Sequence, residues 1–347
     1  MKAFEELIGN AKKRNYDQYL RDNMNEEREQ VIKGIEFEKE LYSNFRKELE
    51  NGELEWEVKT VPEDMLEWAN DELNKGNVAA VDGTNMYPID LISGVFCQVG
   101  VGGLSYTNDE PAINVQSITS HISNEATAGE YFGELVFGKE KKLTKRDIAG
   151  AMQYWELEHC LEREESWVFH DGNIIPRELL TFGVGVQLLK KTIYVKNIIG
   201  IIKGSKALKY RLLGRFLKPT EYLIIESTKD FYDNMFKDER WRTARRYVDV
   251  GGKFIDSYAT YVKRGVYKAH TKSYVFEIHE DVFDKGIALI MADSLRNPRG
   301  LPFLIDLIDS KLSALFENNI YKERMNDLLM EQGELMENIN ERELRSW

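Results

Sequence analysis

Two short segments of the same design constrain the fold more than any other feature of this sequence. The segment VAAVDGTN covers residues 78–85, and WVFHDGNI covers residues 167–174. In each, an apolar run ends in Asp-Gly, which is typical of a buried strand that carries a carboxylate at its end. Because sites collect at the strand ends of an open sheet, Asp82 and Asp171 become candidate site residues. Taken singly, each Asp-Gly fits an ordinary turn equally well.

Strands and helices alternate through the middle of the chain. The glycine-interrupted segment 91–106 fits two antiparallel strands, and 143–166 fits a helix that opens near Thr144. Further strands are predicted within 167–174, 192–208, 221–228 and 273–282, and a helix is predicted after Pro302. This order predicts an α/β fold with a mixed sheet and flanking helices. Two strands followed by helix-strand units, with carboxylates at strand ends, resemble the ribonuclease H-like core.

The chain is predicted to have three parts. Residues 1–75 form a helical N-terminal extension, residues 76–316 the main domain, and residues 317–347 an acidic C-terminal helix. In the N-terminal part, Val31 and Ile35 recur at helical spacing. This pattern fits an interaction or dimerisation arm and a helix packed on the core equally well.

The net charge of −12 is unevenly distributed. Residues 1–75 contribute −8 and residues 317–347 contribute −4, so the middle of the chain is neutral. Within that middle, residues 190–218 hold nine Lys or Arg and no Asp or Glu. Such a stretch suits contact with phosphates, although it also fits a solvated basic face. The acidic ends favour protein partners over DNA.

Composition excludes several classes of protein. Cys97 and Cys160 are the only cysteines, so the chain has neither a disulfide framework nor the cysteine spacing of a zinc site. No apolar run reaches the roughly 18–20 residues that span a bilayer. The first twenty residues read as an amphipathic helix rather than a signal peptide. A cytoplasmic protein without a membrane partner is expected.

The helix predicted within 143–166 adds a third carboxylate. Four of its residues share the face that meets the sheet: Ile148, Met152, Trp155 and His159. Glu156 and Glu158 flank this face on opposite sides, each about 80° away at ~100° per residue. One of the two glutamates can therefore lean toward the strand ends, and for either one alone a solvated boundary position is the ordinary case.

Lys203 follows the third apolar strand, where a lysine is costly unless it is paired with carboxylates or faces an anion. Three carboxylates and a lysine at strand ends are what metal-dependent phosphodiester cleavage needs. Carboxylates bind Mg²⁺ or Mn²⁺, and the metal activates water and stabilises the leaving oxygen. Lysine neutralises the charge that develops on the phosphate.

Five segments together carry a family resemblance. AAVDGTN, AMQYWELEHCLE, VFHDGNII, GIIKGS and ADSLRNPRGLPFLIDLIDSKL occur in this order. The set resembles the NurA nucleases, which work with the hexameric ATPase HerA. The resemblance implies a dimeric, Mn²⁺- or Mg²⁺-dependent DNA nuclease of ribonuclease H-like fold. It also implies four site residues: Asp82, Glu156 and Asp171 as metal ligands and Lys203 as the lysine of the following strand.

Two further matches are looser. TYVKRG resembles a later segment of the family, which implies that Tyr261 and Lys263 lie near the DNA. Lys203 and Lys206 of the basic stretch are expected to contact DNA as well. The family commonly presents a histidine where this chain has Asp309, and Asp306 lies close enough to compete for that role. A carboxylate can bind metal there, but it lacks the proton-transfer range of imidazole near neutral pH.

Three hypotheses follow for the function. The first is a 5′-3′ exonuclease and single-strand endonuclease that processes DNA ends with a HerA-like ATPase, in recombination repair or anti-phage defence. The second is a non-catalytic DNA-binding subunit of a HerA-type translocase complex, which the aspartate at 309 favours. The third, a helical scaffold protein, is favoured only by the acidic ends and predicts no DNA affinity.

Overall fold

The structure is a computed structural model. It describes residues 16–317 except 52, 55, 86–88, 92–93, 109–111, 120–144, 182, 205–207 and 237–250, together with residues 323, 324, 327 and 331. The chain divides into two compact units, Met1–Glu57 and Val58–Trp347. Most of the acidic tail predicted as a helix lies outside the described residues, as does Lys206.

The described part of the first unit is dominated by one long helix, α2 (Tyr16–Glu50). Its sequence is rich in Glu, Lys, Arg and Leu, which are good helix formers. It contains no Pro and a single Gly. The helical character predicted for this segment is therefore confirmed. The prediction of helix throughout 1–75 is wrong at β1 (Val58–Thr60), a short strand of the second unit that pairs with a later strand.

The second unit is built on a ten-stranded mixed sheet. The strands run in the spatial order β1-β8-β9-β10-β7-β6-β2-β4-β3, and β5 pairs with β4. Their bounds are β2 (Val78–Asn85), β3 (Ile89–Leu91), β4 (Gly94–Ser105), β5 (Ala112–Thr119), β6 (Trp167–Asp171), β7 (Ile198–Ile202), β8 (Glu221–Ser227), β9 (Val262–Lys268) and β10 (Ser273–His279).

Five neighbouring strands form the part of the sheet that positions the site. β5, β4 and β2 are antiparallel neighbours, and β6 and β7 continue the sheet parallel to β2. Parallel neighbours need a crossover connection, and helices supply it here before β6 and before β7. Three antiparallel strands followed by two parallel strands is the order of a ribonuclease H-like core. The predicted α/β fold with a mixed sheet is confirmed.

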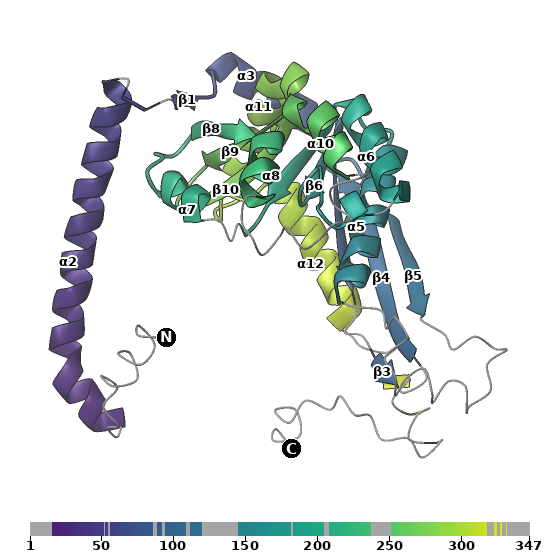
Figure 1. The fold of residues 1–347 in the computed structure, drawn as a ribbon, viewed down its shortest axis with the longest axis horizontal. Helices are drawn as coiled ribbons and strands as arrows, with labels where there is room; N and C mark the ends of the chain where they lie inside the picture. The colour runs from purple at the N-terminus through teal and green to yellow at the C-terminus, as the bar shows by residue number, and fades with distance from the viewer. Residues whose placement is uncertain are drawn as a thin grey trace. The chain divides into compact units, whose positions relative to one another are not determined.

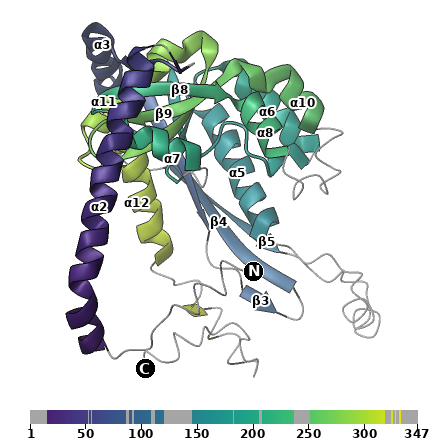
Figure 2. The same cartoon turned by 60° about the vertical axis from the view of Figure 1, so that its left-hand side comes forward.

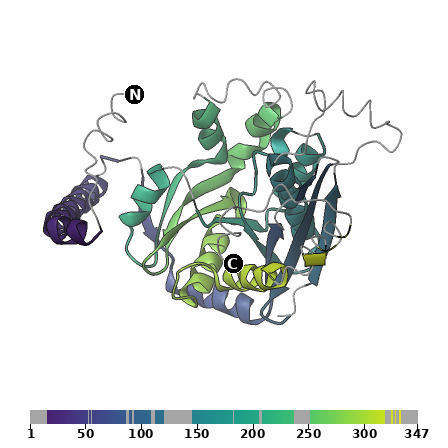
Figure 3. The same cartoon turned by 90° about the horizontal axis from the view of Figure 1, so that it is seen from below.

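Helices cover both faces of this sheet, as Figures 1 and 3 show. One face carries α3 (Glu63–Asn74), α11 (Phe283–Leu295) and α12 (Phe303–Glu317), and the other carries α5 (Lys145–Glu162), α6 (Gly183–Val195), α7 (Leu208–Arg215), α8 (Thr228–Phe236) and α10 (Gly252–Tyr258). Figure 2 shows α5 and α12 on opposite sides of β4. The predicted helix within 143–166 is confirmed, and so is the helix after Pro302.

The strand predicted over 192–208 is wrong at its start. Residues 192–195 are the last turn of α6, and the strand β7 begins only at Ile198. The apolar periodicity of α6 simply runs on into the β-branched residues that precede the strand. Lys196 ends the helix, because its φ of 64° is left-handed and cannot continue it.

Within the described part of the chain, no helix combines the length and the apolar character that a membrane crossing requires.

Candidate active site

The alternation of side chains along three parallel strands brings the predicted site residues to one face of the sheet. Ala80 of β2, Phe169 of β6 and Ile201 of β7 all belong to the main hydrophobic core, which α11 and α12 share. Side chains two positions apart in a strand point to the same face. The residues two positions further on are Asp82, Asp171 and Lys203.

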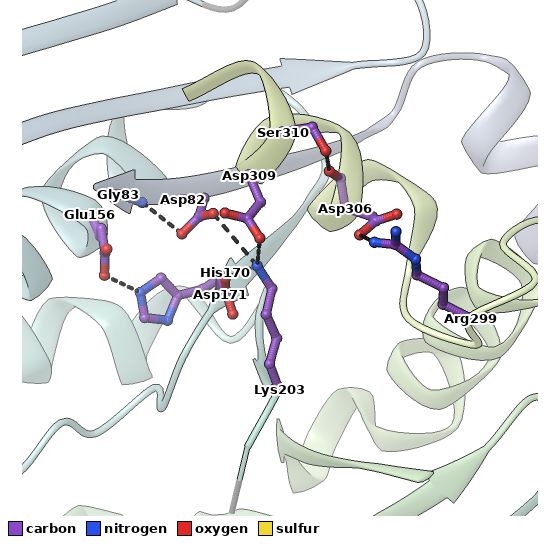
Figure 4. A network of polar contacts seen from close by, with 10 residues as sticks. All are labelled: Asp82, Gly83, Glu156, His170, Asp171, Lys203, Arg299, Asp306, Asp309 and Ser310. Atoms are coloured by element: carbon purple, nitrogen blue, oxygen red, sulfur yellow. Dashed lines mark hydrogen bonds and ion pairs between the residues drawn. The ribbon is translucent and has the colours of Figure 1, made fainter. Parts of the chain in front are cut away.

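Lys203 lies at the centre of a carboxylate cluster (Figure 4). Its Nζ is 2.5 Å from Oδ2 of Asp171, 2.6 Å from Oδ2 of Asp309 and 3.8 Å from Oδ2 of Asp82. The first two distances are those of charge-assisted hydrogen bonds. Three aspartates from two strands and a helix therefore direct oxygen atoms at one position.

Of the two aspartates that compete for the C-terminal role, only Asp309 reaches this cluster. Asp306 faces away from it on α12, where its Oδ1 accepts a bond of 3.2 Å from Arg299 and its Oδ2 one of 3.3 Å from Asn297 (Figure 4). The two positions are three residues apart on one helix, so their side chains leave it about 60° apart at ~100° per residue. Because of this angle, Asp309 points to the cluster while Asp306 points to the loop that contains Asn297 and Arg299.

Burial and crowding of like charges make Asp82 an unusual acid. The side chain is almost fully buried, and its Oδ1 accepts a 2.8 Å hydrogen bond from the Gly83 N–H. Loss of hydration, followed by repulsion from Asp171, raises the pKa of Asp82 from 3.8 to about 9 against the opposing pull of Lys203. For Lys203, burial lowers the pKa, but the Asp171 and Asp82 carboxylates outweigh it and raise the pKa above its usual range.

Glu156 approaches the same strand from the opposite face of the sheet. It is 2% exposed on α5, and its Oε2 lies 3.2 Å from Nε2 of His170. Its charge also raises the pKa of Asp82, so the two carboxylates are close. Gly83 makes this approach feasible, because a Cβ at residue 83 would lie 2.3 Å from Oε1 of Glu156.

Gly83→Ala should therefore destabilise the protein by roughly 1–3 kcal/mol, the usual cost of overpacking a buried site. The reason is the clash between the new methyl group and the Glu156 carboxylate. Urea denaturation measures the effect, and Gly183→Ala is the control, since a Cβ there meets nothing within 4 Å. Adding Glu156→Ala should restore part of the loss through coupling between the two positions. Equal destabilisation in the single and double variants would contradict this account of Gly83.

The remaining predicted residues lie elsewhere. Glu158 lines a different cavity, of about 1030 Å³, to which Tyr261 also contributes. Tyr261 stacks on His279 with ring centroids 6.1 Å apart, and Lys263 forms an ion pair of 2.8 Å with Glu280. This region lies toward the end of β10 that neighbours the start of β7, whereas Lys203 follows the end of β7. The structure does not bring Tyr261 or Lys263 into the carboxylate cluster.

A buried ion pair that sequence reasoning missed holds the loop after Asp171. Arg264 on β9 bonds Glu277 on β10, and the two residues are 4% and 0% exposed. Oε2 of Glu277 accepts a 2.6 Å bond from the Ile174 N–H, and Nη1 of Arg264 donates one of 3.0 Å to Oδ1 of Asn173. The pair thereby fixes the turn that leaves the end of β6.

Aromatic rings enclose this pair. The guanidinium carbon of Arg264 lies 4.0 Å from the ring centroid of Phe231 and 5.1 Å from that of Tyr210, which is the arrangement of cation–π contacts. A sequence signal existed, because Glu277 interrupts the apolar strand SYVFEIH. Its partner is thirteen positions earlier, on the other strand of a hairpin, and only the pairing of β9 with β10 brings them together.

Asp293 holds the start of α12, and with it Asp309. It is fully buried on α11, where Oδ2 accepts a 3.0 Å bond from the Leu304 N–H and Oδ1 accepts one of 2.5 Å from the Tyr106 hydroxyl. The first bond satisfies one of the free N–H groups in the first turn of α12. Loss of hydration raises the pKa of Asp293 to about 6 against the lowering effect of these bonds.

The chemistry of the cluster fits a divalent cation. Asp82 and Asp171 are the side chains of the cluster that would hold it, with Asp309 beside them, since hard cations such as Mg²⁺ and Mn²⁺ prefer carboxylate oxygens. Three carboxylates surround the single Lys203 ammonium, and those of Asp171 and Asp309 add to the effect of burial in raising the pKa of Asp82. Among the described residues, no three His, Cys, Asp or Glu side chains are already arranged as a metal site. Lys203 lies where their oxygens meet, so binding would displace its ammonium.

Comparison with known proteins gives likenesses of fold only. No family model matches the chain, and no curated protein matches it in sequence. A structure of NurA bound to dAMP and manganese is 12% identical, with a TM-score of 0.43 over 85% of this chain and 93% of that chain. The catalytic domain of human endonuclease V is 12% identical, with a TM-score of 0.35 over 84% and 97%. Endonuclease V of Ciona intestinalis, in complex with an inosine-containing DNA, is 13% identical, with a TM-score of 0.28 over 74% and 99%. At these values, function has to be argued from the site itself.

Proposed function

We propose that this chain is a divalent-metal-dependent DNA nuclease of the NurA type. One observation carries the proposal: Asp82, Asp171 and Asp309 direct oxygen atoms at one position beside Lys203, at the carboxyl ends of parallel strands. A purely structural cluster would match one cation with one or two carboxylates. Here three carboxylates compete for a single ammonium, which leaves negative charge for a metal to neutralise.

Each residue has a role in hydrolysis of a phosphodiester. When bound, a divalent cation supplies positive charge that holds the phosphate and helps a water molecule lose its proton. Asp82 and Asp171 would hold this cation from the sheet. The side chain of Asp309 is 47% exposed, so it can reach the attacking water and accept its proton. The Lys203 ammonium, released from the carboxylates, stabilises the charge that develops on the phosphate oxygens.

The finer parts of the proposal come from the sequence resemblance. They are Mn²⁺ or Mg²⁺ as cofactor, 5′-3′ exonuclease and single-strand endonuclease activity, a homodimer, and a HerA-like hexameric ATPase as partner. Glu156 is proposed as a further metal ligand, which requires its carboxylate to leave His170. Tyr261 and Lys263, which lie outside the cluster, are proposed as DNA contacts, and so is Lys206, which lies outside the described residues. The setting is recombination repair or anti-phage defence.

A second candidate is a non-catalytic DNA-binding subunit. The observation that favours it is the close contact between Lys203 and the carboxylates, with distances of 2.5 Å to Asp171 and 2.6 Å to Asp309. Such contacts serve equally well as a permanent ionic lock at the strand ends. On this reading the protein binds DNA but no divalent cation at the cluster.

Incubation of the purified protein with end-labelled single-stranded DNA tests the proposal. Cleavage with Mn²⁺ that EDTA abolishes supports the nuclease. Thermal denaturation with and without Mn²⁺ is the second readout, because a ligand bound only by the folded state raises the melting temperature. Absence of both cleavage and metal-linked stabilisation, also with a HerA-type ATPase present, would leave the binding subunit.

Lys203→Met should separate catalysis from binding. The substitution keeps most of the side-chain volume and removes the charge, so single-turnover cleavage should fall by roughly 10²–10³-fold. The apparent affinity for Mn²⁺ should rise, because the cation no longer competes with an ammonium for the carboxylates. Affinity for DNA in EDTA should fall far less than the rate. Equal losses of rate and affinity would reduce Lys203 to a simple phosphate contact.

Lys253→Met is the matched control for this experiment. Lys253 is exposed on α10 and makes no ion pair among the described residues.

A further inference from the structure

A small cavity lies beside Lys203, where the end of strand β7 is next to the start of strand β10. It has a volume of about 250 Å³ and is bounded by the end of β7, the start of β10 and the exposed side of α7. Its lining includes Lys203, Arg211 and Lys272, together with Tyr210, Ser273 and Tyr274. Arg211 and Lys272 therefore each contribute a cation to the same cavity, while the Lys203 ammonium is paired with the carboxylate cluster.

The charge of this cavity is unbalanced. Among the residues that the structure describes, no Asp or Glu lines it. Neither Arg211 nor Lys272 forms an ion pair within the part of the chain that the structure describes, whereas Lys196, Lys229 and Lys263 each bond a carboxylate. A single solvated lysine does not indicate a binding site. Two cations without carboxylate partners at one cavity create a positive potential that attracts an anion.

The cavity also has a rigid floor. Tyr274 is 5% exposed, and its hydroxyl donates a 3.1 Å hydrogen bond to the carbonyl oxygen of Arg299. Nζ of Lys272 lies 5.1 Å from the centroid of its ring, within the range of a cation–π contact. The exposed Lys272 side chain thus has its ammonium over a buried aromatic ring at the edge of the cavity.

Size and polarity define the class of ligand. Cavities that enclose whole small molecules usually measure roughly 300–1,000 Å³. The volume of about 250 Å³ suits a phosphate group with part of its sugar. Arginine offers a planar fork of donors that matches phosphate oxygens, and lysine adds a point charge. Backbone phosphates of nucleic acids are commonly bound by arginine and lysine side chains, so a backbone phosphate is a ligand of this class.

We propose that this cavity binds a backbone phosphate of the nucleic-acid strand, next to the phosphate held at the carboxylate cluster. The inference rests on the proposed nuclease function and adds the path of the strand. Lys203 lines the cavity along its side chain while its ammonium reaches Asp171 and Asp309. A strand that places one phosphate at the cluster therefore has a neighbouring phosphate beside Arg211 and Lys272.

Binding without catalysis provides the first test. Fluorescence anisotropy of a labelled single-stranded oligonucleotide is measured in EDTA at several salt concentrations for Arg211→Ala, Lys272→Ala and the double variant. We expect the double variant to bind about 10-fold or more weakly and the slope of log affinity against log salt to fall by roughly 0.7 per lost phosphate contact. Lys253→Ala is the control, with an exposed lysine of the same charge on α10. Losses no larger than those of the control would overturn the proposal.

A phosphate scan makes the test specific. Oligonucleotides that each carry one uncharged methylphosphonate linkage are titrated against the wild-type protein and the double variant. The wild type should lose affinity at a linkage where the double variant loses none, because the two changes remove the same contact. Additive losses at every linkage would show that Arg211 and Lys272 act only as part of a general positive surface, and would refute the site.

The outcome can be separated from that of the nuclease proposal. If the scan identifies the linkage but the wild type cleaves nothing with Mn²⁺, the cavity stands as a binding site and the nuclease proposal fails. If cleavage occurs and the double variant matches the wild type in KM, the nuclease stands and the cavity proposal fails. Melting temperatures of the variants are measured to exclude misfolding. We expect them to be unchanged, because residues 211 and 272 are exposed.

Discussion

Replacing Asp82 with Asn should abolish Mn²⁺-dependent cleavage and raise the melting temperature of the metal-free protein. The rate should fall by more than about 10²-fold, because loss of one preorganised charged group at a reacting phosphate typically costs 10²–10³. The stability gain comes from removing an acid that folding places in an unfavourable environment. Burial and Asp171 raise its pKa to about 9, so its ionised form is disfavoured in the folded state.

The stability effect has a defined pH dependence. Because the folded-state pKa lies above the ordinary value of 3.8, the folded protein holds an extra proton between these values. The stability that neutral Asp82 provides is present at low pH and is lost as the pH rises toward 9. The variant lacks this loss, so its advantage in melting temperature should grow steadily from pH 5 to pH 9.

Differential scanning fluorimetry across this pH range, with and without Mn²⁺, checks both parts. Mn²⁺ should stabilise the wild type and leave the variant almost unchanged. Asp284→Asn is the control, since Asp284 is exposed on α11 and makes no ion pair among the described residues. Retained cleavage by a clean preparation of the Asp82 variant would remove Asp82 from the site.

Glu277→Ala should be the most destabilising single substitution considered in this protein. It leaves the Arg264 guanidinium buried without its partner and leaves the Ile174 N–H without an acceptor. Removing one member of a buried ion pair costs about 3–5 kcal/mol. Guanidinium denaturation of the full chain measures the loss, and Glu280→Ala is the control, because Glu280 is an exposed glutamate just beyond the same strand.

The double variant Arg264→Met with Glu277→Leu distinguishes stability from site geometry. Replacing both charges by apolar groups of similar size should recover most of the stability, because neither charge is then buried alone. Cleavage should remain impaired, because the turn at Asn173 and Ile174 has lost both of its anchors. Recovery of stability together with full activity would show that the pair serves only the core.

The sequence carried enough information for the strands that hold the site. Apolar runs before Asp82 and Asp171 predicted buried strands, and the structure pairs these strands directly, with Val81 opposite His170. The predicted inner face of α5 is confirmed as well, since Ile148, Met152 and Trp155 pack against Val81 and its neighbours. These predictions succeeded because strand alternation and helix periodicity are local properties.

Long-range features were less accessible. A helical wheel placed Glu156 and Glu158 at equal angles from the buried face. The space left by Gly83 and the contact with His170 account for the inward position of Glu156. The Arg264 and Glu277 pair depends on a hairpin register that no periodicity encodes. The last turn of α6 reads as strand in the sequence because periodicity alone does not distinguish a short apolar run in a buried helix from a strand.

The helix α12 makes the site depend on the order in which the chain is synthesised. Leu304, Ile305 and Ile308 belong to the main core, and the next residue, Asp309, completes the carboxylate cluster. A ribosome-bound chain that has not yet released residue 309 therefore has an open core and an incomplete site. On the function proposed above, cleavage would therefore begin only after α12 has been synthesised and has packed on the core.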